Sequence, residues 1–179
     1  MSTIIMKSAT KIISEFGQMG HPLGRSINRD EVPKLTTMLI QRLGLSKSEL
    51  DFTPASLKLL ENELLDLHQR MDLQSLSEEE IILLVREISA YIGEVMVLHA
   101  EGKWESLGTL WSTRVVIEGN IKVTKEGRRR ITSSVAYSLG NLGAAALDIV
   151  SKGNTPPLYK TYLSAKRKTV KEELKNVRR

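Results

Sequence analysis

The chain has 179 residues, of which 41% are hydrophobic and 26% are charged, and these values are typical of one globular domain. It contains no cysteine, which excludes a disulfide framework, a zinc–thiolate site and a cysteine nucleophile, and which fits a reducing, cytoplasmic location. No apolar run approaches the ~18 residues that a membrane span needs, so we expect no transmembrane segment.

The net charge of +5 is unevenly distributed along the chain. Residues 160–179 hold eight lysines or arginines and two glutamates, whereas residues 46–101 hold twelve acids and four bases. A bipolar pattern of this kind can steer partners or self-association. We therefore expect a single α+β domain over 1–163 and a basic helical tail over 164–179.

Three helices are predicted in the first part of the chain. A short amphipathic helix near the N-terminus would bury Ile4, Ile5, Ile12, Ile13 and Phe16. After a glycine-rich loop over 17–29, Asp30 is expected to cap a helix over 31–43. Thr53 and Pro54 form a start signal for a helix over 53–71, which would bury Leu57, Leu60, Leu64 and Leu67.

Residues 77–104 predict the helix around which the rest of the chain packs. Ser77 and Glu80 have the spacing of a capping box, and apolar residues then recur at helical spacing. Trp104, beyond the helix end, is expected to pack back onto it. Gly93 costs about 1 kcal/mol against alanine inside a helix, which indicates close approach of another backbone.

The composition changes after this helix. Segments 113–118, 121–124 and 129–135 predict a small antiparallel β-meander with turns at 119–120 and 125–127. Two further helices are expected, over 141–152 and after the Thr155-Pro156-Pro157 start signal. The predicted fold class is α+β: a helical layer around a central buried helix, a small antiparallel β-meander and a basic C-terminal helix.

Two segments together resemble a group of small bacterial proteins of unknown function. The first segment is LDFTPASL, and the second is AYIGEV followed by GKW. The matching positions are Asp51, Pro54, Ser56, Leu57, Tyr91, Gly93, Glu94 and Trp104. The chain departs from the group after Gly-Glu-Val, where a basic residue is usual and Met96 stands here. The resemblance covers about residues 50–118 and implies an α+β domain, but it implies no reaction.

The candidate ligand-binding or structural cluster consists of Asp51, Tyr91, Gly93, Glu94 and Trp104. Glu94 lies in an otherwise apolar segment, where a buried charge would need a partner such as Arg86 or Arg114. A buried carboxylate beside a glycine and a tryptophan suits a ligand site or an acid/base group in a closed pocket. The alternative is a structural hydrogen bond that ties the helix to the loop before the strands.

Other chemistry has little support in the sequence. The three histidines, His21, His68 and His99, lack the spacing of metal ligands, and no nucleophile motif is present, so we expect no catalytic residue, metal or cofactor. The basic patch comprises Arg128, Arg129, Arg130, Lys166, Arg167 and Lys168. Such a patch is either a solvated, aggregation-blocking surface or a nucleic-acid contact.

Three functional hypotheses follow. The first is a non-enzymatic protein-interaction domain, of the accessory, adaptor or immunity-like kind, whose partner is another protein. The second is binding to nucleic acid or an anionic surface through the basic tail and Arg128–Arg130. The third is a small-ligand sensor or enzyme centred on Glu94.

Overall fold

The longest helix, α4 (Glu78–His99), lies at the centre of an α+β fold. The computed structural model describes residues 7–70, 73–118, 121–123, 129–131 and 134–166. Glu80 closes the predicted capping box, since its Oε2 accepts a hydrogen bond from Ser77 N at 2.8 Å and its own amide donates to Ser77 Oγ at 3.2 Å. All residues from 84 to 93 are buried, so the helix is covered on every side there. The prediction of a central interior helix is confirmed.

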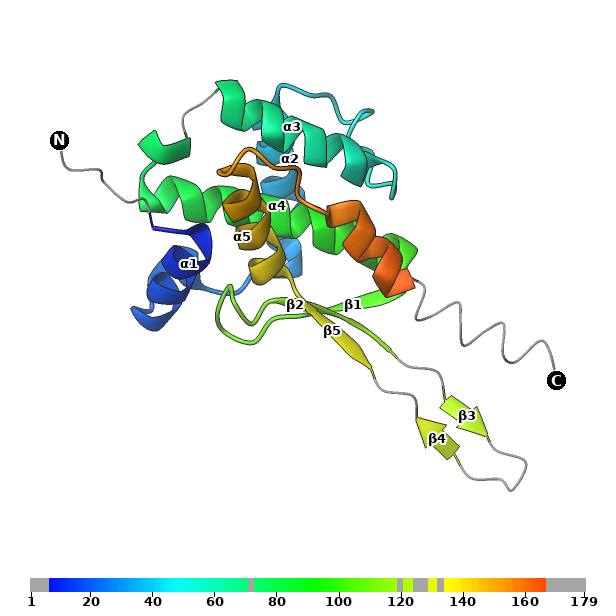
Figure 1. Ribbon diagram of the computed structural model, residues 1–179. Helices are drawn as coiled ribbons and strands as arrows, with labels where there is room; N and C mark the ends of the chain where they lie inside the picture. The colour runs from blue at the N-terminus through cyan, green and yellow to red at the C-terminus, as the bar shows by residue number, and fades with distance from the viewer. Residues whose placement is uncertain (1–6, 71–72, 119–120, 124–128, 132–133, 167–179) are drawn as a thin grey trace.

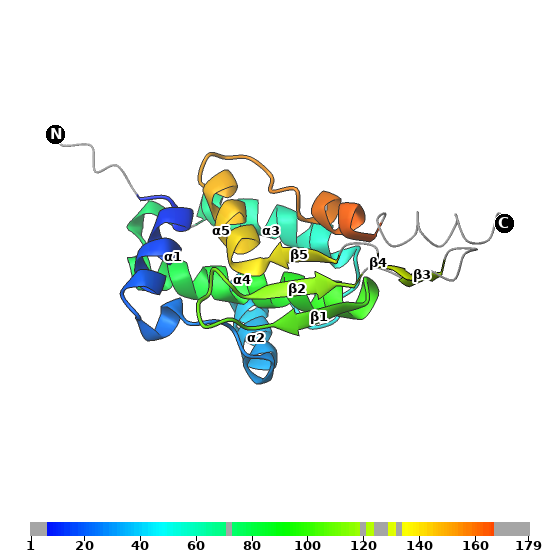
Figure 2. The same ribbon diagram turned by 90° about the horizontal axis from the view of Figure 1, so that it is seen from below.

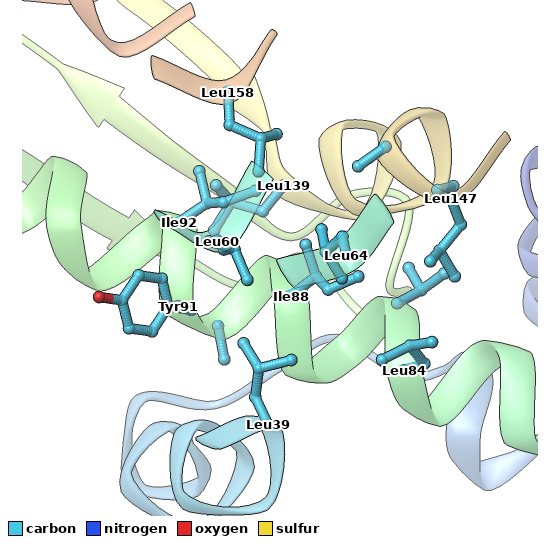
Figure 3. Packing of buried hydrophobic residues seen from close by; sticks show 14 of the residues in the cluster. Leu39, Leu60, Leu64, Leu84, Ile88, Tyr91, Ile92, Leu139, Leu147 and Leu158 are labelled. Atoms are coloured by element: carbon cyan, nitrogen blue, oxygen red, sulfur yellow. The ribbon is translucent and has the colours of Figure 1, made fainter. Parts of the chain in front are cut away.

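Four helices and one further helical segment pack around α4. They are α1 (Ala9–Gln18), α2 (Val32–Leu43), α3 (Ser56–Arg70), α5 (Leu139–Val150) and residues 158–166. Short 3-10 turns lie at η1 (Pro22–Gly24), η2 (Arg29–Glu31) and η3 (Leu73–Ser75). Figure 3 shows how the apolar side chains of these helices meet, with Leu39 of α2, Leu64 of α3 and Leu158 gathered around Ile88 and Ile92 of α4. This single cluster is the hydrophobic core.

The three-stranded antiparallel sheet covers one side of the helices, as Figure 2 shows. Its strands are β1 (Gly102–Glu105), β2 (Arg114–Ile117) and β5 (Val135–Ser138), in the order β1-β2-β5. Val115 and Ile117 of β2 are buried against the helices. The edge strands β1 and β5 each pair with β2 alone among the described strands of this sheet.

The predicted β-meander differs from the observed pairing. Strand β3 (Ile121–Val123) pairs with β4 (Arg129–Ile131) rather than with β2, so a two-residue hairpin turn at 119–120 is wrong. The register that pairs Ile117 with Val135 also pairs Ile121 with Ile131. The four segments therefore follow one long antiparallel hairpin, whose outer part, β3 and β4, projects beyond the helices (Figures 1 and 2). The expected third strand over 129–135 is divided between β4 and β5.

Several helix ends differ from the predictions by a few residues. The helix α3 begins at Ser56 rather than at Pro54, and α5 begins at Leu139 rather than at residue 141. Asp30 does not cap α2; instead Glu31 Oε2 accepts a hydrogen bond from Asn28 N at 2.8 Å in the preceding turn. These shifts leave the predicted buried leucines of α3 in place.

The end of the described chain packs on the body. Residues 158–166 are helical and bury Leu158, Tyr162 and Ala165. The helix therefore continues past the predicted domain boundary at residue 163. The predicted apolar residues Ile4 and Ile5 and the tail from residue 167 lie outside the described residues. In the part of the chain that is described, no helix combines the length and apolar character that crossing a bilayer requires.

Candidate functional site

Tyr91 joins the two segments on which the family resemblance depends. Its buried hydroxyl forms a short hydrogen bond with the Ser56 hydroxyl and accepts another from Phe52 N at 3.1 Å. Its ring stacks on Phe52 with the centroids 4.9 Å apart. Burial raises the pKa of the Tyr91 hydroxyl, so it stays protonated at neutral pH. Tyr91 therefore has a structural role, in fastening the loop before α3 to α4.

Asp51 lies beside this contact but on the surface. Its Oδ1 accepts a hydrogen bond from Thr53 N at 2.9 Å, and the interactions with Thr53 lower the pKa of the carboxyl. The residue is exposed. This is the geometry of an acid that braces the turn at the start of α3.

Gly93 makes room for the ring of Trp104. A Cβ at Gly93 would overlap the outer edge of the Trp104 indole and lie 2.6 Å from Leu139 Cδ1. The close approach predicted at Gly93 is therefore made by side chains rather than by another backbone. Trp104 packs against the core as expected, and its buried Nε1 has no hydrogen-bond acceptor among the described residues.

Glu94 points to a different side of α4. It lines an open groove of about 310 Å³ between α2 and α4, and neither Tyr91 nor Trp104 is among the lining residues. The side chain is half-buried, and no hydrogen bond or ion pair reaches it from the described part of the chain. The structure thus separates Glu94 from the other members of the predicted cluster.

The α2–α4 groove is mostly apolar. The residues that line it are Val32, Pro33, Thr36, Thr37 and Ile40 of α2, Glu94 and Leu98 of α4, Phe52, and the exposed cations Arg29 and Lys47. Leu98 is 55% exposed, which makes it one of the most exposed large apolar side chains among the described residues. A groove of this size, lined by apolar side chains and a few polar groups, has the composition of a binding site.

Phe52 lines this groove from an unusual backbone conformation. Its φ of 61° lies in the left-handed region, which costs an L-residue roughly 1–2 kcal/mol. The stacking on Tyr91 and the hydrogen bond from Phe52 N hold it there. Backbone strain of this kind is common at ligand-binding sites.

The two arginines expected to neutralise Glu94 bind other groups. Arg86 donates to the carbonyls of Leu23 and Arg25, at 3.1 and 2.6 Å, and to Glu31 at 3.1 Å. Arg114 pairs with Glu105 across the sheet at 2.7 Å. The prediction that Arg86 or Arg114 would pair with Glu94 is therefore wrong. Burial lowers the pKa of Arg86, and its hydrogen bonds compensate for the loss of solvent.

A second ion pair links α2 to α4, and neither of its residues lines the groove. Arg42 donates to both carboxylate oxygens of Glu87, at 2.9 and 3.1 Å, and Glu87 is fully buried. This pairing raises the pKa of Arg42. Because both charges are satisfied within the fold, the pair has a structural role and is not free to bind a ligand.

A larger cavity, of about 380 Å³, lies between α1, α4 and α5. Its carboxylate, Asp148, accepts hydrogen bonds from Ala9 N at 2.6 Å and Thr10 Oγ1 at 2.6 Å. Asp148 is thus occupied in capping α1. Within the described ranges no group of three or more His, Cys, Asp or Glu side chains is arranged to hold a metal ion.

The predicted basic patch is only partly within the described residues. Arg129 and Arg130 lie in β4, where Lys122 of β3 is the register partner of Arg130. Lys166 lies at the end of the helical segment 158–166 and is exposed. Arg128, Arg167 and Lys168 lie outside the described residues.

The sequence did not indicate that α2 forms one wall of a site. Its contribution comes from a face that also contains threonines, so no apolar stripe marked it. The one usable signal was Leu98, an apolar residue in the last turn of α4 outside the main stripe. Comparison of the chain with family models, curated proteins and solved structures finds no match.

Proposed function

We propose that this protein is a non-enzymatic protein-interaction domain, of the accessory, adaptor or immunity-like kind, and that its partner binds in the α2–α4 groove. The observation that carries the proposal is an open apolar groove with a largely exposed leucine and a carboxylate that no other described residue pairs with. Apolar surface of this kind is covered in protein complexes. Complete burial of a leucine stabilises a complex by roughly 1.5–3 kcal/mol, so covering the exposed half of Leu98 contributes about 1 kcal/mol.

The charges in the groove support binding rather than catalysis. Among the described residues that line it, Glu94 is the only carboxylate, and the other two charged residues, Arg29 and Lys47, are exposed cations. Acid/base catalysis commonly uses a pair of groups with opposed proton affinities in a site that excludes water. An exposed rim and a single acid are better suited to recognition of a partner.

Site-specific cross-linking tests the proposal. A photo-reactive amino acid replaces Leu98, and in a matched control it replaces Leu107, which is 57% exposed in the loop between β1 and β2. Irradiation in the native cells should give a protein adduct at position 98 and not at position 107. An adduct that forms equally at both positions, or none at position 98, would contradict the proposal.

A second candidate function is binding to nucleic acid or another anionic polymer. The observation that favours it is the projecting hairpin, where Lys122 and Arg130 are register partners and Arg129 is adjacent. Together with the eight lysines and arginines of residues 160–179, these cations would contact phosphates.

Binding to a DNA duplex tests this second function. It predicts an affinity that falls steeply with salt and that is weakened by K122A/R129A/R130A. An affinity that does not change with salt, or one that the triple substitution leaves unchanged, would exclude this function.

A further inference from the structure

We infer that the segment that fits the α2–α4 groove is a short amphipathic helix with a lysine or arginine that pairs with Glu94. This inference rests on the proposed function and specifies the chemistry of the partner. It follows from four properties of the groove: its length, the state of its backbone groups, its small volume and its charge.

The length of the groove matches two turns of a helix. Its α2 wall extends from Val32 to Ile40, and eight residues of helix rise about 12 Å. The positions that line it, at 32, 33, 36, 37 and 40, recur at helical spacing along α2. Apolar anchors at i, i+3 or i+4, and i+7 of a docked helix span about 11 Å, which fits the same length.

The backbone of the groove excludes an extended peptide. Its two long walls are helices, whose interior amides and carbonyls are hydrogen-bonded within α2 and α4, and Phe52, which lines it from the following loop, donates its amide to the Tyr91 hydroxyl. An extended segment would find no free strand edge there and would lose the water that solvates its own backbone. A helix satisfies its backbone internally and presents only side chains.

A helix also fits better than a small molecule. The volume of about 310 Å³ is at the lower end for ligand pockets, which bury most of a ligand's surface. Here Leu98 stands 55% exposed at the rim, so a small molecule would stay largely in water. A docked amphipathic helix can leave its polar outer face in solvent without losing binding free energy.

The charge of Glu94 indicates which kind of residue of the partner lies at the centre of the contact. Glu94 is half-buried and unpaired among the described residues, so it interacts with an incoming charge more strongly than exposed groups do. Arg29 and Lys47 are exposed, and their effect is screened by salt. A basic residue among the apolar anchors would therefore pair with Glu94, whereas acids are favoured only on the outer flank.

A displayed library of helical peptides provides the test. The library keeps leucines at i, i+3, i+4 and i+7 and varies one inward position among basic, neutral and acidic residues. The targets are the wild-type chain, Glu94→Lys, Leu98→Asp and the control Leu107→Asp. Each variant is first checked for an unchanged thermal unfolding midpoint, which is expected because all three side chains are partly exposed.

With the wild-type chain we expect selection of lysine or arginine at the varied position, with about tenfold tighter binding than the peptide that has glutamine there. With Glu94→Lys we expect the preference to invert, so that acidic residues are selected. Leu98→Asp should weaken binding at least tenfold, and Leu107→Asp should leave it unchanged. Peptides that depend on Leu98 but show no charge preference, or that bind without helical circular dichroism, overturn the inference and leave the proposed function standing. Equal binding to wild type and Leu98→Asp contradicts both the inference and the proposed function.

Discussion

Replacement of Arg42 by methionine tests how strongly the buried ion pair holds α2 against α4. In the folded chain Arg42 is the hydrogen-bond donor to both oxygens of Glu87, whose side chain is fully buried. Methionine fills similar space but leaves the carboxylate in the core without a cation. Breaking a buried pair in this way costs about 3–5 kcal/mol, a large part of the ~5–15 kcal/mol that stabilises a typical domain.

Urea unfolding followed by circular dichroism measures this cost. In a domain of this length the same loss lowers the thermal midpoint by roughly 10 °C. The double variant Arg42→Met/Glu87→Leu is the matched control, and it should recover most of the lost stability because no unpaired charge remains. A loss below about 1 kcal/mol for Arg42→Met, or no recovery in the double variant, would refute the reasoning.

Three further predictions concern α4 and its contacts. Gly93→Ala should destabilise the fold by about 1–2 kcal/mol, although alanine favours a helix, because the new methyl overlaps the Trp104 ring and the Leu139 side chain. In a Trp104→Leu background only the end of the Leu139 side chain is still in the way, so the same alanine should cost less, as urea unfolding of both pairs will measure. Tyr91→Phe removes a buried hydroxyl that accepts from Phe52 N and is hydrogen-bonded to Ser56, so the free energy of unfolding should fall by about 1–3 kcal/mol in the same assay. The capping hydrogen bonds from Ser77 hold the pKa of Glu80 below its ordinary 4.5, so the unfolded chain binds more protons than the folded one near that pH. Stability should therefore fall as pH decreases from about 5 to 3, and Glu80→Gln should flatten this slope; an identical slope in the variant would contradict the assignment.

The helices could be predicted because their signals are local. The capping box at Ser77 and Glu80 and the periodic leucines of α3 are complete within a few residues, and each is present in the structure. The small errors at Ser56 and Leu139 concern only helix ends, where the first turn depends on neighbouring contacts.

The sheet could be predicted only in part because strand pairing is not local. The turn residues at 119–120 suggested a tight hairpin, but β2 instead pairs with β5, about 20 residues further along the chain. The strand β1 contains Gly102 and Glu105, which are poor strand formers, and it forms because β2 provides a partner. Burial of Val115 and Ile117 against the helices, rather than the turn sequence, determines this arrangement.

The candidate site could be predicted only as single residues. The sequence singled out Glu94 as an acid in an apolar segment, but apart from Leu98 its apolar neighbours in the groove come from α2 and from Phe52, more than 40 residues earlier in the chain. Tyr91 projects from another face of α4, and Trp104 lies in β1 with its ring packed on Gly93, so both have structural contacts. A helix distributes nearby residues around its axis, so proximity in sequence did not imply a shared site.

The central proposal is that a protein partner binds in the α2–α4 groove. Calorimetric titration of the partner segment identified by cross-linking at position 98 tests this claim directly, with wild type, Leu98→Asp and Leu107→Asp compared at one salt concentration. We expect at least a tenfold weaker affinity for Leu98→Asp, which corresponds to about 1.4 kcal/mol, and an unchanged affinity for Leu107→Asp. Equal affinities for wild type and Leu98→Asp would contradict it.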